Sequence, residues 1–406
     1  RGGGPARRTG APQGVVRVKR RHEPRILIYS QDGLGLGHMR RTSLLATEFI
    51  RQVPGASALT LSDSPLGQFF ATSPGHDFLK LPSIRKAGPG EWEAVSLSSS
   101  FPDVLDLRSR IIMSAIRGFE PDVVLVDHMP HGAMGELVPA LRKVRSDRMR
   151  VVLGLRDILD APEIVRRRWT AEGAYEALEE FYDEVLVYGS RDVLDVSEEY
   201  AWPKSLALRP TYCGYVCEEP HRRARRLSAV PVERDPARPT VLVVAGGGGD
   251  AHRMLSSVLG AAESVHASTS AEFLVVTGPF MPTADVQALQ RQAADLTMVE
   301  VRRRIRGRGR MARADLVVAM AGYNTTVELL NAGTPTLLIP RTGPSAEQRT
   351  RARLFADREW VRWIDPDHLE PDVVAAASVR ALRKPVAPSV GPDLGGRATA
   401  VSHLTR

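Results

Sequence analysis

The sequence predicts an α/β protein made of two doubly wound domains in tandem, on three observations. Short apolar segments alternate with helix-like stretches, this alternation occurs twice along the chain, and a glycine-rich turn follows the first apolar segment of each series. Short strands that are apolar on both faces and separated by helices form parallel sheets covered on either side. Two such domains leave a cleft between the carboxyl ends of their strands, where ligands of this architecture bind.

The first series of predicted strands covers residues 25–30, 58–61, 78–81, 122–126, 151–155 and 185–187, with helical patterns at 39–52 and 103–119. The second series covers residues 240–245, 272–276, 298–301, 315–319 and 336–339. Between them, residues 218–239 are charged, rich in proline and without apolar periodicity, which is typical of a linker between domains. The predicted organisation is a disordered basic arm (1–24), an N-terminal domain (25–217), this linker and a C-terminal domain (240–406). The last helix can pack back on the N-terminal domain.

The positive charge of the chain is concentrated at its start. The net charge is +8, but residues 1–24 hold seven basic residues and one acid, so the remainder is close to neutral. We interpret this arm as a disordered tail and rank attraction to anionic lipid or nucleic acid second. Because the basic charge lies in a tail and aromatic residues make up 6% of the chain, a nucleic-acid-binding protein is the least favoured class.

Two cysteines, Cys213 and Cys217, are the only ones in the chain. Two thiols do not complete a zinc site, and their spacing is not that of a redox pair, so reduced cysteines in a cytoplasmic protein are the expectation. No apolar run reaches the roughly 18 residues that a membrane-spanning helix needs. We therefore expect no transmembrane segment, and leave peripheral association with a membrane open.

The turn after the first strand contains glycines at 33, 35 and 37, followed by His38 and a predicted helix. Gly35 and Gly37 allow the backbone to approach a ligand closely, and the free N–H groups of the helix start favour a polar or anionic group. A neutral histidine that faces the cleft is a suitable general base for a hydroxyl group or water. The alternative is a capping or packing histidine, and dinucleotide binding is not excluded by this turn alone.

Two carboxylates compete to orient His38. Asp127 closes one predicted strand and Asp157 follows the next, so both are expected at the cleft edge. Either could hold the imidazole as the acid of a catalytic triad does. The alternative for both is a helix N-cap, which is common at such turns.

The second domain carries the donor-site candidates. Four consecutive glycines, Gly246, Gly247, Gly248 and Gly249, follow its first strand and suit the close approach of a phosphate. Further on, Gly322 makes a turn and Asn324 and Thr325 start a helix, which builds an anion site. Glu328 lies one helical turn later on the same face, where it can accept hydrogen bonds from ribose hydroxyls. Glu347 and Gln348 begin another helix at the cleft edge, where they can contact sugar hydroxyls.

Residues 240–360 resemble the nucleotide-sugar half of glycosyltransferase family 28, a family with the GT-B fold of two Rossmann-like domains. The resemblance implies that Gly246–Gly249, Gly322, Asn324 and Thr325 hold the diphosphate of the donor, that Glu328 binds ribose, and that Gln348, with Glu347 beside it, contacts the donor sugar. The stretch from Gly35 to Arg41 resembles the opening of related predicted glycosyltransferases and of sugar-nucleotide hydrolases, which implies His38 as the base and Arg41 as a cleft residue. The chain departs from the family at residues 302–310, where six arginines occupy a segment that normally meets the nucleotide base.

The resemblance implies an inverting glycosyltransferase that uses a nucleotide-diphosphate donor, with uracil inferred from the family only, and that needs no cofactor and no metal. His38 would act as base, oriented by Asp127, on an acceptor that the sequence does not identify, whether a small molecule or a lipid-linked one. Acceptor contacts are expected from residues 82–100 and 129–135, and residues 83–101 are expected to form a mobile loop. A nucleotide-sugar hydrolase, a 2-epimerase of the same fold and a non-catalytic binding module remain as alternatives.

Overall fold

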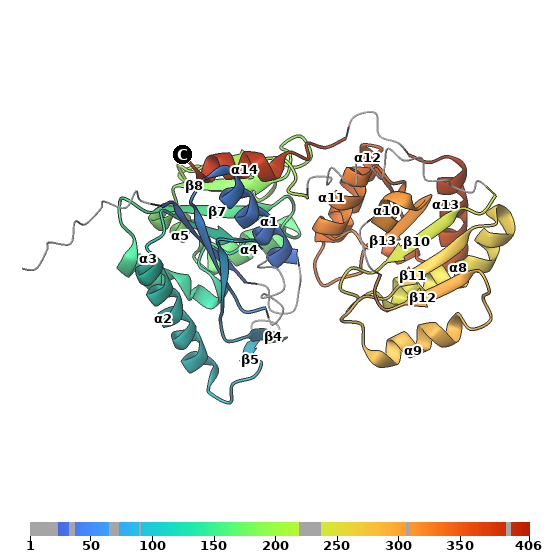
Figure 1. Cartoon of the computed structure of the whole chain (residues 1–406), viewed down its shortest axis with the longest axis horizontal. Coiled ribbons are helices and arrows are strands. Elements are labelled where there is room, and N and C mark those ends of the chain that lie inside the picture. The colour runs from blue at the N-terminus through green and yellow to red at the C-terminus, as the bar shows by residue number, and fades with distance from the viewer. Residues whose placement is uncertain are drawn as a thin grey trace, which may run out of the picture.

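The computed structural model describes residues 23–31, 37–64, 73–88, 91–218, 237–305, 309–386 and 391–406. These residues form two lobes, each built on a parallel sheet with helices packed on its faces (Figure 1). This arrangement confirms the predicted fold class of two Rossmann-like α/β domains. The basic arm up to residue 22 and most of the linker, residues 219–236, lie outside the described residues, so the exact domain boundaries stay predictions.

The N-terminal sheet has the strand order β3-β2-β1-β6-β7-β8-β9, with every neighbouring pair parallel. Its strands are β1 (Arg25–Ser30), β2 (Ser57–Ser62), β3 (His76–Lys80), β6 (Val123–Asp127), β7 (Arg150–Arg156), β8 (Glu184–Tyr188) and β9 (Pro210–Tyr212). The helices are α1 (Gly37–Gln52), α2 (Phe101–Phe119), α3 (Leu137–Val144), α4 (Pro162–Ala171), α5 (Ala174–Phe181) and α6 (Val196–Glu199), with a short turn η2 (Ala133–Gly135). Because Ser30 pairs with Asp127, β1 and β6 end side by side, and α1 starts directly above them.

One expectation for this domain is wrong in part. Residues 83–101, expected to form a mobile loop, include an antiparallel hairpin of β4 (Ile84–Gly88) and β5 (Glu91–Ala94); their mobility stays a prediction. Ile84 packs with Val104 of α2 and Ala133 of η2 in a small buried cluster, and Trp92 and Ala94 pack against it. The strands are short and mix charged residues with apolar ones, so their pattern is weak, and burial against α2 fixes them instead.

The C-terminal sheet has the order β12-β11-β10-β13-β14-β15, again parallel throughout. Its strands are β10 (Thr240–Val244), β11 (Glu272–Val276), β12 (Val299–Arg302), β13 (Leu316–Ala319), β14 (Thr336–Leu338) and β15 (Arg362–Trp363). The helices are α8 (His252–Thr269), α9 (Thr283–Gln292), α10 (Gly309–Arg313), α11 (Tyr323–Ala332), α12 (Glu347–Asp357), α13 (Pro371–Arg383) and α14 (Gly396–Leu404), with a short turn η3 (Pro366–His368).

The last helix, α14, returns to the other lobe and packs on α1 and β8 (Figure 1). His403 lies with Nδ1 2.7 Å from Oε1 of Glu184, and Arg150 donates to the carbonyl of His403 at 2.9 Å. Buried residues of α14, Val401 and Leu404, belong to a core cluster that also contains residues of both sheets. The chain therefore crosses between the lobes twice, and its end holds them together.

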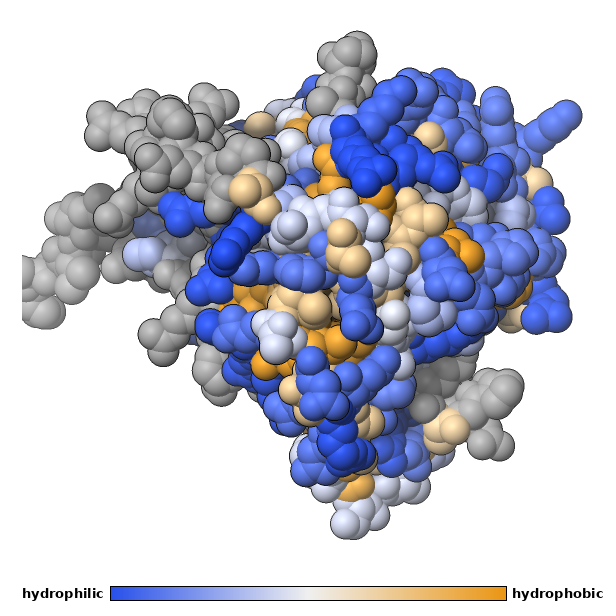
Figure 2. All heavy atoms as spheres, turned by 90° about the vertical axis from the view of Figure 1, so that its right-hand side faces the viewer, coloured by the Kyte–Doolittle hydropathy of each residue, from blue (hydrophilic) through white to orange (hydrophobic). Residues whose placement is uncertain are grey.

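Figure 2 shows the outer face of the C-terminal lobe, which is largely hydrophilic, with hydrophobic residues only in small patches. Within the described part of the chain, none of the helices combines the length and the apolar character that crossing a bilayer requires.

Buried charges join the two lobes. Asp157, at the end of β7, accepts two hydrogen bonds from Arg351 of α12, at 2.6 and 2.9 Å, and both side chains are almost fully buried. Tyr323 of α11 donates to the carbonyl of Tyr188 at 2.9 Å and accepts from the backbone N–H of Val216 at 2.9 Å. These contacts replace the solvation that each polar group loses on burial, so they fix the lobes in one relative orientation.

We predict that Asp157→Asn lowers the free energy of unfolding by about 3 kcal/mol, because it leaves the buried guanidinium of Arg351 without its bidentate partner. Urea unfolding followed by circular dichroism measures this. Asp106→Asn is the control, since it removes an exposed pair with Arg110 on α2 and should change little. A loss at Asp157 no larger than that of the control would show that this pair does not hold the lobes together.

Candidate active site

His38 and Asp127 meet at the carboxyl edge of the N-terminal sheet. His38 lies in the first turn of α1, and its Nδ1 is 2.5 Å from Oδ2 of Asp127, the last residue of β6. The side chain of His38 is 20% exposed, whereas that of Asp127 is fully buried. With Nδ1 held by the carboxylate, Nε2 is the nitrogen left to take a proton from a ligand, which is the geometry that a general base needs.

Arg41 completes this cluster. Its Nη2 lies 2.8 Å from both carboxylate oxygens of Asp127, and the side chain is 2% exposed. Burial alone would raise the pKa of Asp127, but the charges of Arg41 and His38 outweigh burial and hold that pKa well below its usual range. The guanidinium also lies over the rings of Tyr188 and Tyr323, at 5.4 and 5.5 Å. Arg41 thus links the acid of the N-terminal domain to α11 of the C-terminal domain.

A second histidine, His128, was not predicted. Its ring lies 5.4 Å from that of His38, and its backbone has a positive φ of 78°. Burial, and then the charge of Arg156, hold the pKa of His128 well below its ordinary value, so the ring is neutral. The signal for it in the sequence is its place directly after Asp127, where a strained residue next to a catalytic group often has a role.

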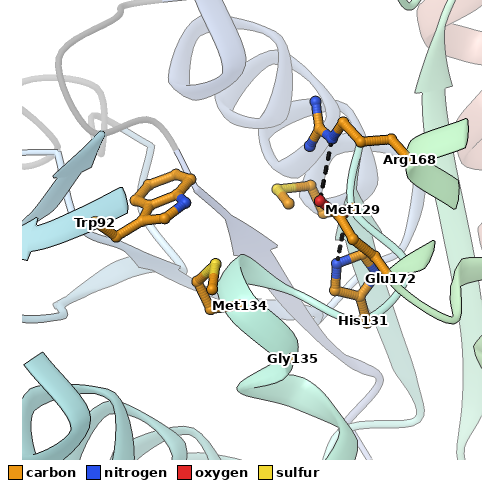
Figure 3. A pocket seen from close by; sticks show the side chains of 7 residues that line it. All are labelled: Trp92, Met129, His131, Met134, Gly135, Arg168 and Glu172. Carbon is orange, nitrogen blue, oxygen red and sulfur yellow. Dashed lines mark hydrogen bonds and ion pairs between the residues drawn. The ribbon is translucent and has the colours of Figure 1, made fainter. Parts of the chain in front are cut away.

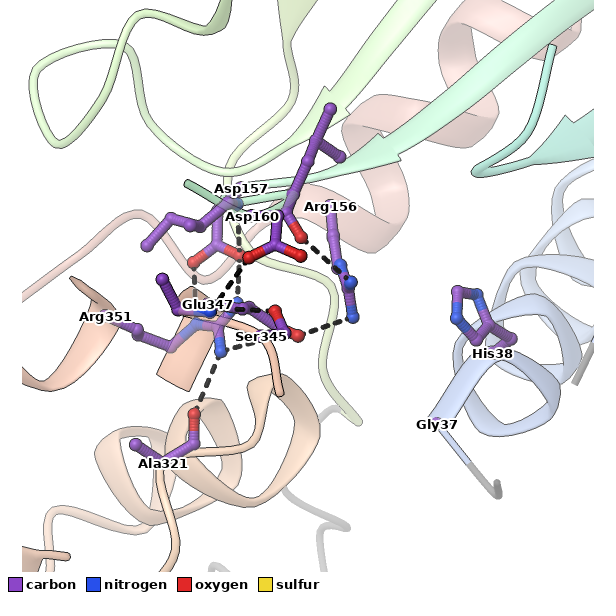
Figure 4. Close-up of polar contacts among 12 residues, drawn as sticks. Gly37, His38, Arg156, Asp157, Asp160, Ala321, Ser345, Glu347 and Arg351 are labelled. Atoms are coloured by element: carbon purple, nitrogen blue, oxygen red, sulfur yellow. Dashed lines mark hydrogen bonds and ion pairs between the residues drawn. The ribbon is translucent and has the colours of Figure 1, made fainter. Parts of the chain in front are cut away.

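The two competing carboxylates have different partners. Among the described residues, Asp127 contacts His38, whereas Asp157 is engaged by Arg351 (Figure 4). The role of orienting the base is therefore left to Asp127, and Asp157 acts at the interface between the lobes. Gly37 starts α1 beside His38, and its carbonyl accepts from Asn324 of α11 at 2.9 Å. Gly35 lies outside the described residues.

The glycine turn after β10 has a backbone conformation that only glycine adopts readily. Gly246 and Gly248 have positive φ of 60° and 90°, and a Cβ on Gly248 would lie 2.0 Å from the carbonyl oxygen of Thr277. A Cβ on Gly246 would have Oγ1 of Thr325 as its nearest neighbour, at 4.0 Å. The turn and the start of α11 therefore face each other across a short gap, as an anion site between them requires.

α11 starts without a side-chain cap. Its N-cap residue is Gly322, which makes no side-chain hydrogen bond, so the first N–H groups of the helix are available to an anion. Asn324 reaches Gly37 of the other lobe, and Glu328 forms an ion pair with Arg40 of α1. Arg40 was missed by sequence analysis, although it stands two residues after His38 on the same helix.

Arg341 connects the glycine turn to α12. Its guanidinium lies 3.1 Å from Oδ2 of Asp250, and its backbone N–H donates to Oε1 of Gln348 at 3.3 Å. Its side chain is 26% exposed, and its Nε is buried without a hydrogen-bond partner in the described structure. This arginine, which follows β14, is a cation near the predicted diphosphate site that sequence analysis did not single out.

Glu347 lies between two arginines. Its oxygens lie 2.7 Å from Arg156 at the end of β7 and 2.9 Å from Arg351 on its own helix (Figure 4). Burial would raise the pKa of Glu347, but these two cations outweigh burial and lower it. In this conformation the carboxylate is therefore engaged between the lobes, and its predicted contact with a donor sugar stays a prediction.

The arginine-rich segment is described only in part, since residues 306–308 lie outside the described residues. Arg302 pairs with Glu300 at 2.5 Å, and Arg303 donates to the carbonyl of Met281 at 3.1 Å. Both are exposed and have local partners, so the two interpretations of this segment, a solvated loop and an anion-binding loop, stay open. Among the described residues, no three side chains of His, Cys, Asp or Glu are grouped as a metal site; metal independence stays a prediction.

Comparison with known proteins supports the same class of fold. Residues 241–388 match the model of the Glycosyltransferase family 28 C-terminal domain, which confirms the predicted resemblance. A comparison with curated proteins gives no match. Similar solved structures include the glycotransferase of kitacinnamycin, with 16% identity, 94% of this chain and 95% of that chain covered and a TM-score of 0.59.

Two other similar structures are also glycosyltransferases. MurG of Acinetobacter baumannii is 14% identical, with 94% and 99% of the two chains covered and a TM-score of 0.59. The calicheamicin glycosyltransferase CalG4 is 15% identical, with 94% of each chain covered and a TM-score of 0.57. The chain therefore has the GT-B fold, and its C-terminal domain is of the family 28 type.

We predict that Gly248→Ala destabilises the protein by about 1–3 kcal/mol, because an alanine must adopt the strained backbone and meet the Thr277 carbonyl. Gly249→Ala is the matched control, since a Cβ there meets nothing within 4 Å and the φ of Gly249 is not in the left-handed range. Thermal unfolding of both variants checks this. Equal melting temperatures for the two variants would contradict the turn geometry.

The ion pairs of Glu347 predict a dependence of stability on pH. Because its pKa is lowered from the ordinary 4.5 in the folded protein, its stabilisation is complete above that value and is lost as pH falls through the lowered pKa. Glu347→Gln should therefore be less stable than the wild type at pH 7, and the difference should shrink as pH falls below 4.5. Chemical unfolding of both proteins between neutral and acid pH measures the difference. A difference that grows in acid would contradict the assignment.

Proposed function

We propose that the protein is an inverting glycosyltransferase that transfers a sugar from a nucleotide-diphosphate donor, a UDP-sugar by family resemblance, to a hydroxyl group of an acceptor without a metal ion. The observation that carries the proposal is the contact between the two halves of the site. Asn324, at the predicted diphosphate site, donates to Gly37, the residue before His38. This hydrogen bond therefore joins the start of α11, where the proposed anion site lies, to the start of α1, which carries the proposed base.

In the proposed reaction, Nε2 of His38 takes the proton of the acceptor hydroxyl as its oxygen attacks the anomeric carbon. The bond from that carbon to the diphosphate oxygen breaks on the opposite face, so the configuration inverts. Asp127 keeps the imidazole in position and stabilises the imidazolium that forms. The leaving diphosphate gains negative charge, which the N–H groups of α11, the amides of Gly246–Gly249 and Arg341 are placed to stabilise.

The pair between Arg40 and Glu328 bears on donor binding. Glu328 is the proposed ribose ligand, so a bound donor would exchange the guanidinium of Arg40 for two ribose hydroxyls. Without a donor, Arg40 and Glu328 neutralise each other's charge. When the donor binds, Arg40 loses Glu328 as its partner. Side-chain exposures of 24% for Arg40 and 12% for Glu328 show that the pair is largely shielded from water, so its replacement requires that the donor satisfy Glu328 in turn.

A cytoplasmic setting is part of the proposal. Cys213 and Cys217 are both buried and form no disulfide with each other, and burial raises the pKa of Cys213 to about 12, so its thiol is inert rather than redox-active. Peripheral contact with a membrane depends on the acceptor, because a lipid-linked acceptor would require it and a small molecule would not.

We predict that His38→Ala lowers turnover by about 10²–10⁴-fold and leaves donor affinity unchanged, because a general base contributes to the chemical step alone. The assay is product formation, with donor binding measured by calorimetry, using the nucleotide sugar that the protein binds best. His368→Ala, an exposed histidine of η3, is the control and should retain full activity. Unchanged turnover in His38→Ala would remove His38 as the base.

Incubation of the wild-type protein with the donor alone separates the alternative activities. A transferase leaves the donor intact until an acceptor is added. Release of free sugar and nucleotide would indicate a hydrolase, and a new sugar in the product would indicate an epimerase. Donor binding without any reaction in the presence of acceptors would leave a binding module.

A further inference from the structure

A pocket of about 420 Å³ opens in the N-terminal domain beside the catalytic pair. Its lining residues are Trp92, Met129, His131, Met134, Gly135, Arg168 and Glu172 (Figure 3). They come from β5, from the segment that follows β6, and from the end of α4. This volume falls within the range of pockets that hold small organic ligands.

The pocket and the base share one short segment of chain. Met129 is the second residue after Asp127, and its N–H donates to the carbonyl of Asp127 at 3.1 Å. The segment is held from three sides: His128 donates to the carbonyl of Gly154 at 2.9 Å, Tyr182 to that of Pro130 at 2.6 Å, and Ala133 to the hydroxyl of Tyr29 at 2.9 Å. The floor of the pocket is therefore rigid and fixed relative to His38.

Three of the lining side chains are apolar: the indole of Trp92 and the thioethers of Met129 and Met134. Figure 3 shows Trp92 and Met134 near each other on one side and Met129 across from them. Met134 is 45% exposed and has a positive φ of 51°, so an apolar side chain is held toward solvent in a strained backbone conformation. Methionine sulfur and an indole face are polarisable and interact well with aromatic rings.

On the side of Met129 the lining is also polar (Figure 3). His131 Nε2 lies 3.3 Å and Arg168 Nε 3.2 Å from the carboxylate of Glu172, whose pKa is lowered chiefly by its hydrogen bond with His131. His131 is 5% exposed, and its Nδ1 is buried without a hydrogen-bond partner in the described structure. A ligand that fits this lining needs both an apolar ring and a hydrogen-bonding group.

We propose that this pocket binds the acceptor, and that the acceptor is a small aromatic alcohol or phenol whose flat ring lies against Trp92, Met129 and Met134. Its reacting hydroxyl is directed toward His38, and any further polar group on the ring meets Glu172, Arg168 and His131. The proposal rests on the proposed glycosyltransferase function and adds the class of acceptor to it. A long flexible lipid chain would leave the charged side chains facing methylene groups, so we favour the ring.

The test is calorimetric titration of the full-length protein with 2-naphthol and with decahydro-2-naphthol, which has the same carbon skeleton but is saturated and puckered. We expect 2-naphthol to bind about tenfold more tightly than the saturated alcohol. Met134→Glu should weaken the binding of 2-naphthol by about tenfold. Trp92→Leu, which keeps an apolar wall without the aromatic face, should remove the preference for the flat ring.

Val373→Glu is the matched control, because Val373 of α13 is 41% exposed, much as Met134 is, and lies outside the pocket. It should bind 2-naphthol as the wild type does, and the melting temperatures of the variants report whether they fold. The proposal is overturned if the wild type does not bind 2-naphthol, if Met134→Glu binds it equally well, or if the saturated alcohol binds as tightly.

A parallel titration with UDP-glucose separates this proposal from the function on which it rests. Binding of the nucleotide sugar without binding of 2-naphthol would retain the transferase and reject the aromatic acceptor. Binding of 2-naphthol in the expected pattern, without binding of UDP-glucose, would retain the pocket as a ring-binding site and count against UDP-glucose as the donor.

Discussion

The negative charge of Asp127 is the constraint on which the site depends. A carboxylate buried at the end of a strand needs cations and hydrogen bonds close by, and the two that it receives come from the first turn of α1, His38 and Arg41. The same pair therefore fixes the imidazole, the start of α1 and the contact of Arg41 with Tyr323 in the other domain. The contacts that neutralise Asp127 therefore position both the candidate base and the start of α11, where the predicted donor site lies.

Buried carboxylates at the interface between the domains are likewise neutralised by arginines close by. Asp157 with Arg351, and Glu347 with Arg156, are complementary charges brought together from opposite lobes. Such buried pairs contribute little net stability compared with apolar contacts, but misplacing either partner is costly, so they select one relative orientation of the lobes. That orientation sets the separation between the candidate base and the predicted diphosphate site, and a transfer reaction would depend on this distance.

The fold was largely predictable because its strands are apolar on both faces and its glycine turns recur at equivalent places. The strand at residues 272–276 and the helix end at Gln52 were predicted at their observed positions. The short strands β4, β5, β9 and β15 were not predicted, since a strand of two to five residues with charged neighbours has no clear period and depends on tertiary packing.

Site residues could be predicted within each domain, but the contacts that join the two domains could not. His38 and Asp127 could be inferred because the ends of adjacent parallel strands and the following helix share one edge of a sheet. The partners that bridge the domains, Arg40 with Glu328 and Arg156 with Glu347, could not, because their sequence separation carries no periodic signal. Arginine is also common in this chain, so its sequence does not single out any one of them. Contact with a carboxylate of the other lobe distinguishes Arg40 and Arg156, and contact with Asp250 beside the glycine turn distinguishes Arg341.

The proposed function requires that the glycine turn after β10 and the start of α11 hold a diphosphate. Calorimetric titration of the full-length protein with UDP, UMP and uridine under identical conditions tests it most directly. The account predicts that UDP binds clearly more tightly than UMP and that uridine binds weakest, because most of the affinity comes from the backbone amides and cations around the phosphates. Equal affinities for the three compounds, or no binding of any nucleoside diphosphate, would contradict it.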